Sequence, residues 1–293
     1  MGKARSAEEY PLGEGKLKWT CTEWLADNLD GDFLLLDCQP NIHVYIIEHI
    51  PGAVYFNPAL LRVPKRGLPG NYIGKKAVRK NFQRVGIEND RNVVVYTGTG
   101  ACKGWGDGLE QAFIAYSLMR FGCNSVWVLD GGLDSWKHEG RPLEQTYPEI
   151  EESTFEVDVQ KNFFLTYEQF KEVKDNDGVM LLDARPPNWY EGESPWRKPG
   201  HIPGAINVPW KSFMHEENTR LLKSDDEIRS VLDAHGITED KHIICSCGTG
   251  RESTLEFILF KYLLGWPCVS NYEGSYTEWL HYDEPNVTGP EPR

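Results

Sequence analysis

Long hydrophobic runs are missing from this chain of 293 residues. No stretch of about 18 consecutive apolar residues occurs, which argues against a helix that spans a membrane. The first fifteen residues, MGKARSAEEYPLGEG, lack the apolar centre of a secretion signal. We therefore expect a cytoplasmic protein with no membrane partner.

Positive charge is also scarce. The chain has 31 lysines and arginines against 44 aspartates and glutamates, which gives a formal net charge of −13 at pH 7. A surface of this sign repels nucleic acids and anionic membranes, so we expect neither as a partner. The net charge does not exclude a local cationic pocket for a small anion.

Paired cysteine motifs are absent. The number of cysteines is seven, which is odd, and no CxxC pair has a partner pair. Both a disulfide framework and a structural zinc site are therefore disfavoured, and we expect reduced thiols. The cysteines are Cys21, Cys38, Cys102, Cys123, Cys245, Cys247 and Cys268.

An internal repeat is the main positive feature of the sequence. Two apolar runs that end in aspartate, FLLLD at 33–37 and VMLLD at 179–183, lie 146 positions apart, and each predicts a buried strand. The segments Thr20–Glu23 and Thr166–Gln169 precede them at the same offset. Both segments fit a capping box, in which a hydroxyl residue starts a helix and an acid or amide three residues later reaches back.

Three further pairs of segments continue the match in the same order. The offset changes slightly from pair to pair, which indicates short insertions in one copy or the other. The pairs are EHIPGAVYFN with GHIPGAINVP, NVVVYTGTG with HIICSCGTG, and LDGGLDSW with YEGSYTEW. Ordered matches of this kind mean that a whole domain is duplicated.

The two copies predict an α/β protein with two domains. Short apolar strands alternate with helical patterns in each copy, which is typical of a mostly parallel sheet flanked by helices. We place the first domain at 1–145 and the second at 155–293. The polar, proline-bearing stretch at about 139–154 is the predicted linker. Ligands of such sheets bind at the carboxyl ends of the strands.

Cys247 stands where the apolar run HIIC meets a glycine-rich turn, CGTGRES. The residues after this turn predict a helix with a broad buried face. The amino end of a helix favours a thiolate, the glycines allow backbone amides to curl around an anion, and Arg251 adds positive charge. We therefore expect Cys247 to have a lowered pKa and to act as a nucleophile.

The other cysteines are expected to be structural. Cys245 alternates with Cys247 along one strand, which makes a disulfide between the two geometrically awkward. Cys102 lies in a seven-residue insertion of the first copy, beside Lys103. We favour a structural or interdomain role for Cys102, with a second reactive thiol as the alternative.

The first copy serves as an internal control for the second. Thr97 occupies the position of Cys247, Ala101 that of Arg251, and Gln39 that of Arg185. The first copy therefore lacks both the thiol and the nearby cations, and we expect catalysis in the second domain only. The shared aspartates Asp37 and Asp183, like the shared histidines His49 and His201, favour structural roles.

The sequence resembles the tandem rhodanese family of sulfurtransferases in four landmarks that occur in order. They are the repeated LLLDC and LLDAR runs, the two HIPGA segments, the six-residue loop that opens at Cys247, and the terminal DGGLDSW and EGSYTEW turns. The resemblance covers about residues 16–282. It implies two tandem rhodanese-like domains and a cycle without metal or organic cofactor. In this cycle the cysteine takes a sulfane sulfur from a small anionic donor and passes it, as a persulfide, to a nucleophilic acceptor.

The resemblance also implies roles for individual residues. Cys247 would carry the sulfur, the amides of the loop would hold the persulfide anion, and Arg185 and Arg251 would attract the donor. Arg197, in an insertion of the second copy, is a further candidate for donor binding, and Trp196 beside it could form a wall of the pocket. The loop residues concerned are Gly248, Thr249, Gly250, Arg251 and Glu252. Members of this length suggest a monomer.

The loop departs from both well-known subtypes of the family. The mercaptopyruvate type usually reads CG(S/T)GVT, whereas this loop reads CGTGRE, and Glu252 partly offsets the charge of Arg251. We favour thiosulfate as the donor because a dianion rewards a second cation, and mercaptopyruvate is the alternative. Two other classes remain: a cysteine-dependent phosphatase or arsenate reductase, which usually has a loop one residue longer, and a non-catalytic sulfur-relay or binding module.

Overall fold

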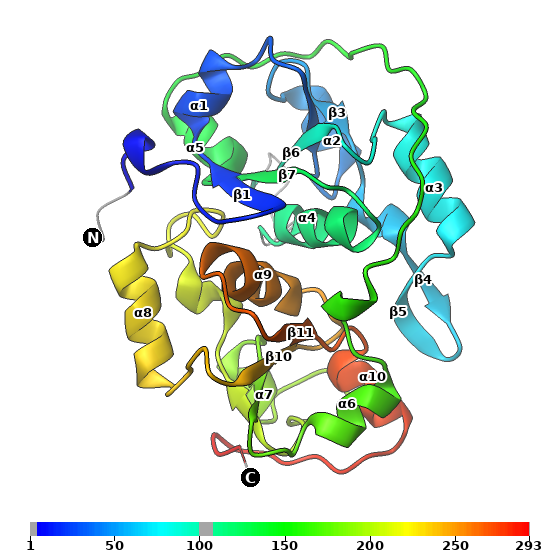
Figure 1. The fold of residues 1–293 in the computed structure, drawn as a ribbon, viewed down its shortest axis with the longest axis vertical. Coiled ribbons are helices and arrows are strands. Elements are labelled where there is room, and N and C mark those ends of the chain that lie inside the picture. Colours follow the sequence, from blue (N-terminus) through cyan, green and yellow to red (C-terminus); the bar gives the residue numbers. More distant parts are fainter. Residues whose placement is uncertain (1–4, 100–107, 293) are drawn as a thin grey trace. The chain divides into compact units, whose positions relative to one another are not determined.

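The computed structural model describes residues 5–99 and 108–292, and these divide into two compact units. Unit 1 comprises Met1–Arg62, Tyr72–Gln160 and Met214–Lys223, and unit 2 comprises Val63–Asn71, Lys161–Phe213 and Ser224–Arg293. Each unit contains one parallel sheet with its helices (Figure 1). The predicted linker and domain limits stay a prediction. Cys102 and Lys103 lie outside the described residues.

The sheet of unit 1 has five strands in the order β1-β7-β6-β2-β3, and every neighbouring pair is parallel. α4 packs against β6 and β7. A buried cluster that includes Leu35, Val94 and Trp136 fills the core of this unit. The elements of unit 1 are η1 (Ala7–Glu9), β1 (Leu17–Thr20), α1 (Thr22–Asp27), β2 (Phe33–Asp37), α2 (Ile42–Ile47), β3 (Val54–Tyr55), η2 (Pro58–Leu61), α3 (Lys75–Arg84), β6 (Asn92–Tyr96), α4 (Glu110–Arg120), β7 (Val126–Leu129) and α5 (Gly132–His138).

The sheet of unit 2 has four parallel strands in the order β11-β10-β8-β9. Ile244 of β10 faces an aromatic core with Phe170, Tyr272 and Trp279, while α9 packs against β10 and β11. The elements of unit 2 are η3 (Lys161–Phe163), α6 (Tyr167–Val173), β8 (Val179–Asp183), α7 (Pro187–Glu191), β9 (Ala205–Asn207), η4 (Trp210–Phe213), α8 (Asp225–Ala234), β10 (His242–Ser246), α9 (Ser253–Ile258), the π-helical turn η5 (Leu259–Leu263), β11 (Val269–Asn271) and α10 (Ser275–His281). A separate hairpin pairs β4 (Arg62–Lys65) with β5 (Leu68–Tyr72).

The fold class predicted from the repeat is confirmed: both sheets are parallel, and helices flank them. The four apolar runs at 33–37, 92–96, 179–183 and 242–246 form β2, β6, β8 and β10. β8 and β10 are hydrogen-bonded neighbours with Asp183 opposite Ser246. Residues that follow these two strands therefore emerge side by side at one edge of the sheet.

The two predicted capping boxes have different outcomes. Thr166 caps the start of α6. The Gln169 amide donates to the Thr166 hydroxyl at 3.3 Å, and the Thr166 amide donates to the Gln169 side chain at 3.0 Å, which confirms that prediction. The prediction for Thr20 was wrong. Thr20 remains in β1, where it pairs with Leu129 of β7, so the helix starts one residue later and Cys21 caps it.

Among residues 5–99 and 108–292, no helix combines the length and the apolar character that a bilayer crossing requires.

Candidate active site

Cys247 follows the carboxyl end of β10 and is fully buried, with 0% of its surface exposed. Its backbone amide donates a hydrogen bond to Ser275 Oγ at 3.0 Å. The strand therefore sets the position of the cysteine from one side and α10 sets it from the other.

Several hydrogen-bonding groups surround the Cys247 sulfur. The Gly250 amide donates to Sγ at 3.1 Å, Ser253 Oγ lies 3.5 Å from Sγ, and Ser275 Oγ lies 3.8 Å away. An anion at Sγ would thus find one amide and the Ser253 hydroxyl within reach, while the Ser275 hydroxyl donates to the Tyr272 carbonyl at 2.8 Å. This arrangement agrees with the expectation that the loop amides cradle an anion, although only part of the predicted set points at Sγ.

The expectation of a lowered thiol pKa was wrong for the resting protein. The pKa of Cys247 is raised to about 11, first by burial and second by the carboxylate of Glu252, while hydrogen bonds from Ser253 act in the opposite direction. The prediction considered the loop amides and Arg251 but not the loss of water around the sulfur. Burial disfavours any charged form that lacks full compensation.

Gly248 and Gly250 are both required by close approaches of the backbone. A Cβ at Gly248 would lie 2.6 Å from the indole of Trp196. Gly250 has a φ of +73°, and a Cβ there would lie 2.1 Å from the carbonyl oxygen of Glu273. The sequence indicated that these glycines allow the loop amides to turn toward an anion. The close packing gives a second reason why glycine is needed at both positions.

Arg185 is fully buried and lies on the Asp183 carboxylate. Its Nε and Nη2 donate to the two carboxylate oxygens at 2.6–3.1 Å, and Nη2 also donates to the Gly200 carbonyl at 2.9 Å. Burial alone would lower the pKa of Arg185, but Asp183 and, more weakly, the Cys247 sulfur raise it. Nη1 has no hydrogen-bond partner among the described residues.

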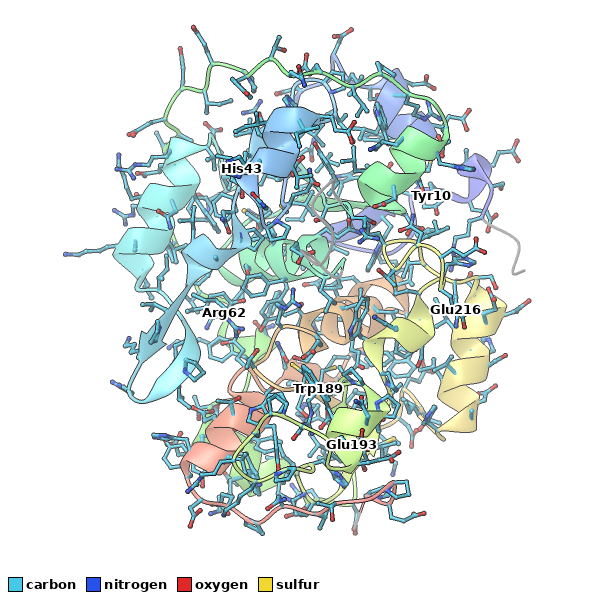
Figure 2. The ribbon with its side chains drawn as sticks, turned by 180° about the vertical axis from the view of Figure 1, so that it is seen from behind. Tyr10, His43, Arg62, Trp189, Glu193 and Glu216 are labelled. Atoms are coloured by element: carbon cyan, nitrogen blue, oxygen red, sulfur yellow. The ribbon has the colours of Figure 1, made fainter. Side chains whose placement is uncertain are left out.

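Two aromatic rings hold the Arg185 guanidinium. Its central carbon lies 5.2 Å from the centre of the Trp196 ring and 4.5 Å from that of Tyr276. Trp196 Nε1 donates to Thr277 Oγ1 at 2.8 Å, which fixes the indole, and Trp189 packs edge-on against it. Trp189 of α7 is labelled in Figure 2. Trp196 therefore forms a wall beside the loop, as its position in the sequence suggested.

Arg197 is not brought to the sulfur. Its side chain is 71% exposed, and its guanidinium lies 3.4 Å from the Asp283 carboxylate. Lys198 pairs with the same carboxylate at 2.6 Å. The expected donor-binding role of Arg197 therefore has no support in the geometry, because the insertion turns its two cations toward the chain after α10.

The remaining loop residues are half-buried. Burial raises the pKa of Glu252, and the positive charge of Arg251 opposes part of this shift. The Arg251 carbonyl accepts hydrogen bonds from the amide and hydroxyl of Thr254, which fixes the turn into α9. Arg251 thus acts on the Glu252 carboxyl that lies beside the thiol. Thr249 is half-buried at the tip of the loop.

Ser253 and Ser275 were missed by the sequence reasoning. Ser275 has a φ of +50°, in the left-handed region that favours glycine, and Gly132 occupies the corresponding position of the first copy with a φ of +56°. A serine where the other copy has glycine costs backbone strain, which points to a role for its hydroxyl, and this hydroxyl accepts a hydrogen bond from the Cys247 amide. The mismatch between GGLD and GSYT in the repeat is the signal that could have found it.

The first copy keeps the geometry but not the chemistry of this site. Gln39 donates from its backbone and side-chain amides to Asp37 at 2.9 and 3.0 Å, as Arg185 does to Asp183, but it carries no charge. Thr97 is buried at the position of the cysteine, and its amide bonds the Gln111 side chain at 3.1 Å.

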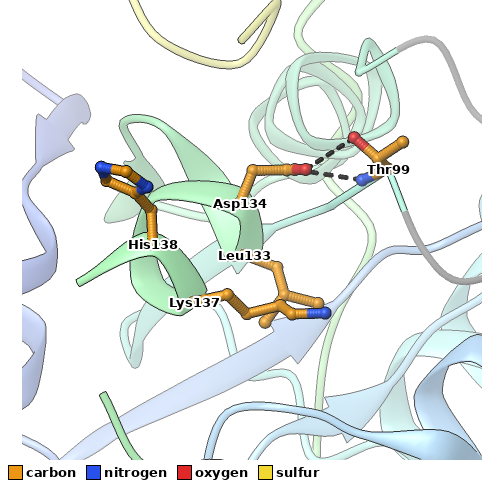
Figure 3. Close-up of a pocket in the computed structure, with 5 residues that line it drawn as sticks. All are labelled: Thr99, Leu133, Asp134, Lys137 and His138. Carbon is orange, nitrogen blue, oxygen red and sulfur yellow. Dashed lines mark hydrogen bonds between the residues drawn. The ribbon is translucent and has the colours of Figure 1, made fainter. Parts of the chain in front are cut away.

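A cavity of about 360 Å³ lies between Thr99 and α5 in unit 1 (Figure 3). Its lining includes Asp134, which accepts hydrogen bonds from the amide and hydroxyl of Thr99 at 3.0 and 2.6 Å.

The two shared histidines, His49 and His201, make matching contacts: in each, Nδ1 bonds a carbonyl at 2.8 or 2.9 Å, as expected of structural residues. Within the described ranges, no group of three or more His, Cys, Asp or Glu side chains could hold a metal ion.

Comparison with known proteins gives a consistent result. A family model described as "Rhodanese-like domain" matches residues 22–139 and again 166–282. A Synechococcus elongatus protein, provisionally named a thiosulfate sulfurtransferase, is 33% identical over 95% of this chain and 87% of its own length. Thiosulfate sulfurtransferase of Bos taurus is 29% identical over 91% and 93%, and 3-mercaptopyruvate sulfurtransferase of Escherichia coli K12 is 28% identical over 88% and 92%.

Solved structures agree on the fold. A structure of EanB in a cysteine-persulfide state with ergothioneine superposes with a TM-score of 0.80 at 24% identity, over 97% of this chain and 72% of EanB. The structure of YnjE gives a TM-score of 0.80 at 23% identity, over 94% and 69%. At this level of identity the two comparisons establish the architecture alone.

Proposed function

This chain belongs to the rhodanese-like family of sulfurtransferases, and from this membership we propose that Cys247 carries a sulfane sulfur from an anionic donor to a nucleophilic acceptor. One observation carries the proposal. A buried thiol and a buried guanidinium meet at one edge of a parallel sheet, and the guanidinium retains an N–H group without a partner among the described residues. The first copy has neither charge nor thiol at these positions.

In the first step, the Cys247 thiol loses its proton, and the thiolate attacks the outer sulfur of the donor. The bond between this sulfur and the rest of the donor breaks, and its electron pair leaves with the departing group, which is sulfite when the donor is thiosulfate. Arg185 Nη1 would bind the anionic part of the donor during this step. The Gly250 amide and the Ser253 hydroxyl would stabilise the persulfide anion that remains, and Ser275 would hold the Cys247 backbone in place.

In the second step, a nucleophile such as cyanide or a thiolate attacks the outer sulfur of the persulfide. The sulfur–sulfur bond breaks, and its electron pair returns to Cys247 as a thiolate. Cyanide leaves as thiocyanate and a thiolate leaves as a new persulfide. No net oxidation occurs in the protein, so the cycle needs no redox partner.

We take thiosulfate as the first candidate donor because Arg251 belongs to the Cys247 loop and Arg185 follows the neighbouring strand β8. Mercaptopyruvate is the second candidate, and one observation favours it: the Glu252 carboxyl hydrogen-bonds the Cys247 thiol, where a second negative charge on the donor would be repelled. Relatives of both names are similar to this chain over most of its length. A steady-state comparison of the two donors with one acceptor decides between them.

The Cys247→Ser variant tests the proposal. We expect it to lose thiocyanate formation from thiosulfate and cyanide, because a serine hydroxyl is a poor sulfur acceptor. The exposed Cys268→Ser variant is the matched control and should keep full activity. Mass spectrometry of the native protein after donor treatment should find one added sulfur on the peptide that contains Cys247.

Two other outcomes would contradict the proposal. Turnover of a phosphate monoester without sulfur transfer would indicate a cysteine-dependent phosphatase. Absence of both reactions, with no sulfur added to Cys247 by either donor, would indicate a binding module.

A further inference from the structure

Glu252, the last residue of the loop before α9, folds back toward the loop's first residues. Its backbone is already helical, with φ and ψ of −61° and −40°. From this position its carboxyl hydrogen-bonds both the Cys247 thiol and the Gly248 amide. The loop thus contains an anion of its own at the place where the sulfur must react.

Cys247 and Glu252 form a pair of acids in contact. Burial raises the pKa of both groups, and each also responds to the other. Two adjacent negative charges in a buried site are costly, so the pair holds one proton. A thiol is ordinarily the weaker acid of the two, so we assign the proton of the pair to the sulfur and the negative charge to the carboxylate.

Other charged groups around the pair do not remove this negative charge. Arg251 offsets it in part, whereas the Asp183 carboxyl adds to it. Arg185, which also faces Cys247, is already neutralised by its two-oxygen contact with Asp183. The local sum is close to zero, and the charge nearest to Sγ is negative.

The Glu252 carboxyl occupies one of the loop amides, that of Gly248. Of the loop amides predicted to hold a persulfide, that of Gly250 points at Sγ, whereas that of Gly248 is bound by the Glu252 carboxyl. A donor or persulfide that needed both amides would first have to displace the carboxylate. A doubly charged donor would meet more repulsion in doing so than a singly charged or neutral one.

We propose that Glu252 is a specificity-determining residue, a resident anion that discriminates among sulfur donors and acceptors by their charge and disfavours dianions. The part that concerns donors rests on the proposed sulfur transfer. The part that concerns charge at Sγ does not, and the two parts are tested separately.

Two alkylating reagents that differ in charge test the electrostatic part. Iodoacetate is an anion and iodoacetamide is neutral, and their rates at Cys247 are measured on the full-length protein by mass spectrometry of the Cys247 peptide. We expect Glu252→Gln to raise the ratio of the iodoacetate rate to the iodoacetamide rate by about tenfold, the factor that corresponds to one pKa unit of interaction. Glu252→Asp keeps the charge and should keep the low ratio.

Controls make this result specific. Glu239→Gln removes an exposed carboxylate of the same unit and should leave the ratio unchanged. Glu252→Ser is a second neutral variant in case the amide disturbs the loop, and its ratio should also rise. An unchanged ratio in both neutral variants overturns the proposal.

Donor kinetics test the specificity part. In Glu252→Gln, we expect kcat/KM for thiosulfate to rise relative to that for mercaptopyruvate, mainly through a lower KM for thiosulfate. If the alkylation ratio rises while the donor preference stays constant, the role in specificity is overturned. If neither the native protein nor the variant transfers sulfur, the proposed function fails, and the alkylation ratio still decides the electrostatic part.

Discussion

At the scale of single residues, Cys247 carries its proton at neutral pH, because burial and the Glu252 carboxylate raise its pKa to about 11. A thiol of this kind is a weak nucleophile until a donor arrives. Donor binding must therefore supply part of the stabilisation of the thiolate. Under the proposed function, Arg185 Nη1, which has no hydrogen-bond partner among the described residues, would receive the donor's negative charge.

This raised pKa predicts the pH dependence of alkylation. In the absence of a donor, the rate of iodoacetamide reaction at Cys247 should increase steadily from pH 7 to pH 10, because the reactive thiolate accumulates only as the pH approaches about 11. The measurement is the rate of modification of the Cys247 peptide across this pH range. A rate that levels off below pH 8 would contradict the assigned environment of the sulfur.

Arg185→Gln reproduces in the second copy what the first copy has naturally, since Gln39 bonds Asp37 without a charge. We expect kcat/KM for thiosulfate to fall by about 10- to 100-fold, because a hydrogen bond to a charged group contributes about 1.5–3 kcal/mol. Steady-state kinetics measures the loss, and circular dichroism checks that the variant is folded. Native-like kinetics in a folded Arg185→Gln protein would rule out donor binding by this side chain.

The sequence singled out Cys247 and Arg185, and the structure places each after one of two adjacent strands at the same edge of the sheet. It did not predict the direction of the thiol pKa shift. That direction depends on the burial of Sγ and on where the Glu252 side chain folds, and neither follows from the order of residues. The sequence likewise did not predict the partner of Arg197, because Asp283 lies far along the sequence.

At the scale of elements, α9 contains a buried carboxyl that the sequence pattern did not single out. Glu256 is 0% exposed, and neither of its side-chain oxygens has a hydrogen-bond partner among the described residues. Its pKa is raised well above the usual value, first by burial and then by the carboxylates of Asp183 and Glu252. The periodicity predicted a broad apolar face, but it could not show that burial continues around the helix through Glu256.

Glu256→Met should stabilise the protein, by about 1–3 kcal/mol at pH 8, because an unsatisfied buried polar group costs about that much. The gain should be smaller at pH 5. As the pH rises above the ordinary glutamate value, the unfolded chain releases its proton before the folded protein does, and unfolding is favoured. Thermal unfolding at both pH values measures the effect.

The exposed Glu239→Gln variant is the control for this comparison, and its melting temperature should follow the native protein at both pH values. A lower melting temperature for Glu256→Met at pH 8 would mean that the carboxyl has a stabilising partner.

At the scale of the whole molecule, unit 1 includes a segment from the second copy, Met214–Lys223. Its backbone is tied to the end of β7: the Leu222 amide donates to the Asp130 carboxylate at 2.8 Å, and the Gly131 amide donates to the Arg220 carbonyl at 3.0 Å. Asn218 completes the set by donating to the Gly131 carbonyl at 2.9 Å. The repeat predicted two domains in sequence order, but it carries no periodic signal for a segment that packs with the other copy.

A fragment of residues 1–160 should therefore be less stable than unit 1 is within the whole chain. Removal of Met214–Lys223 leaves the buried Asp130 carboxylate and the Gly131 backbone without these partners, and each such loss costs about 1–3 kcal/mol. Addition of a peptide that spans 214–223 should raise the melting temperature of the fragment. A fragment with a cooperative transition that does not respond to the peptide would show that the segment is dispensable.

Met214–Lys223 also constrains how genes of this kind can recombine. A crossover between the two copies would exchange whole halves among paralogues, yet each new first half would have to match a short stretch encoded far downstream. Changes at Asp130 or Gly131 should therefore be inherited together with changes at Asn218, Arg220 or Leu222. Loss of either half by deletion would leave the survivor incomplete, so selection should preserve the duplication even where only one copy has a working thiol.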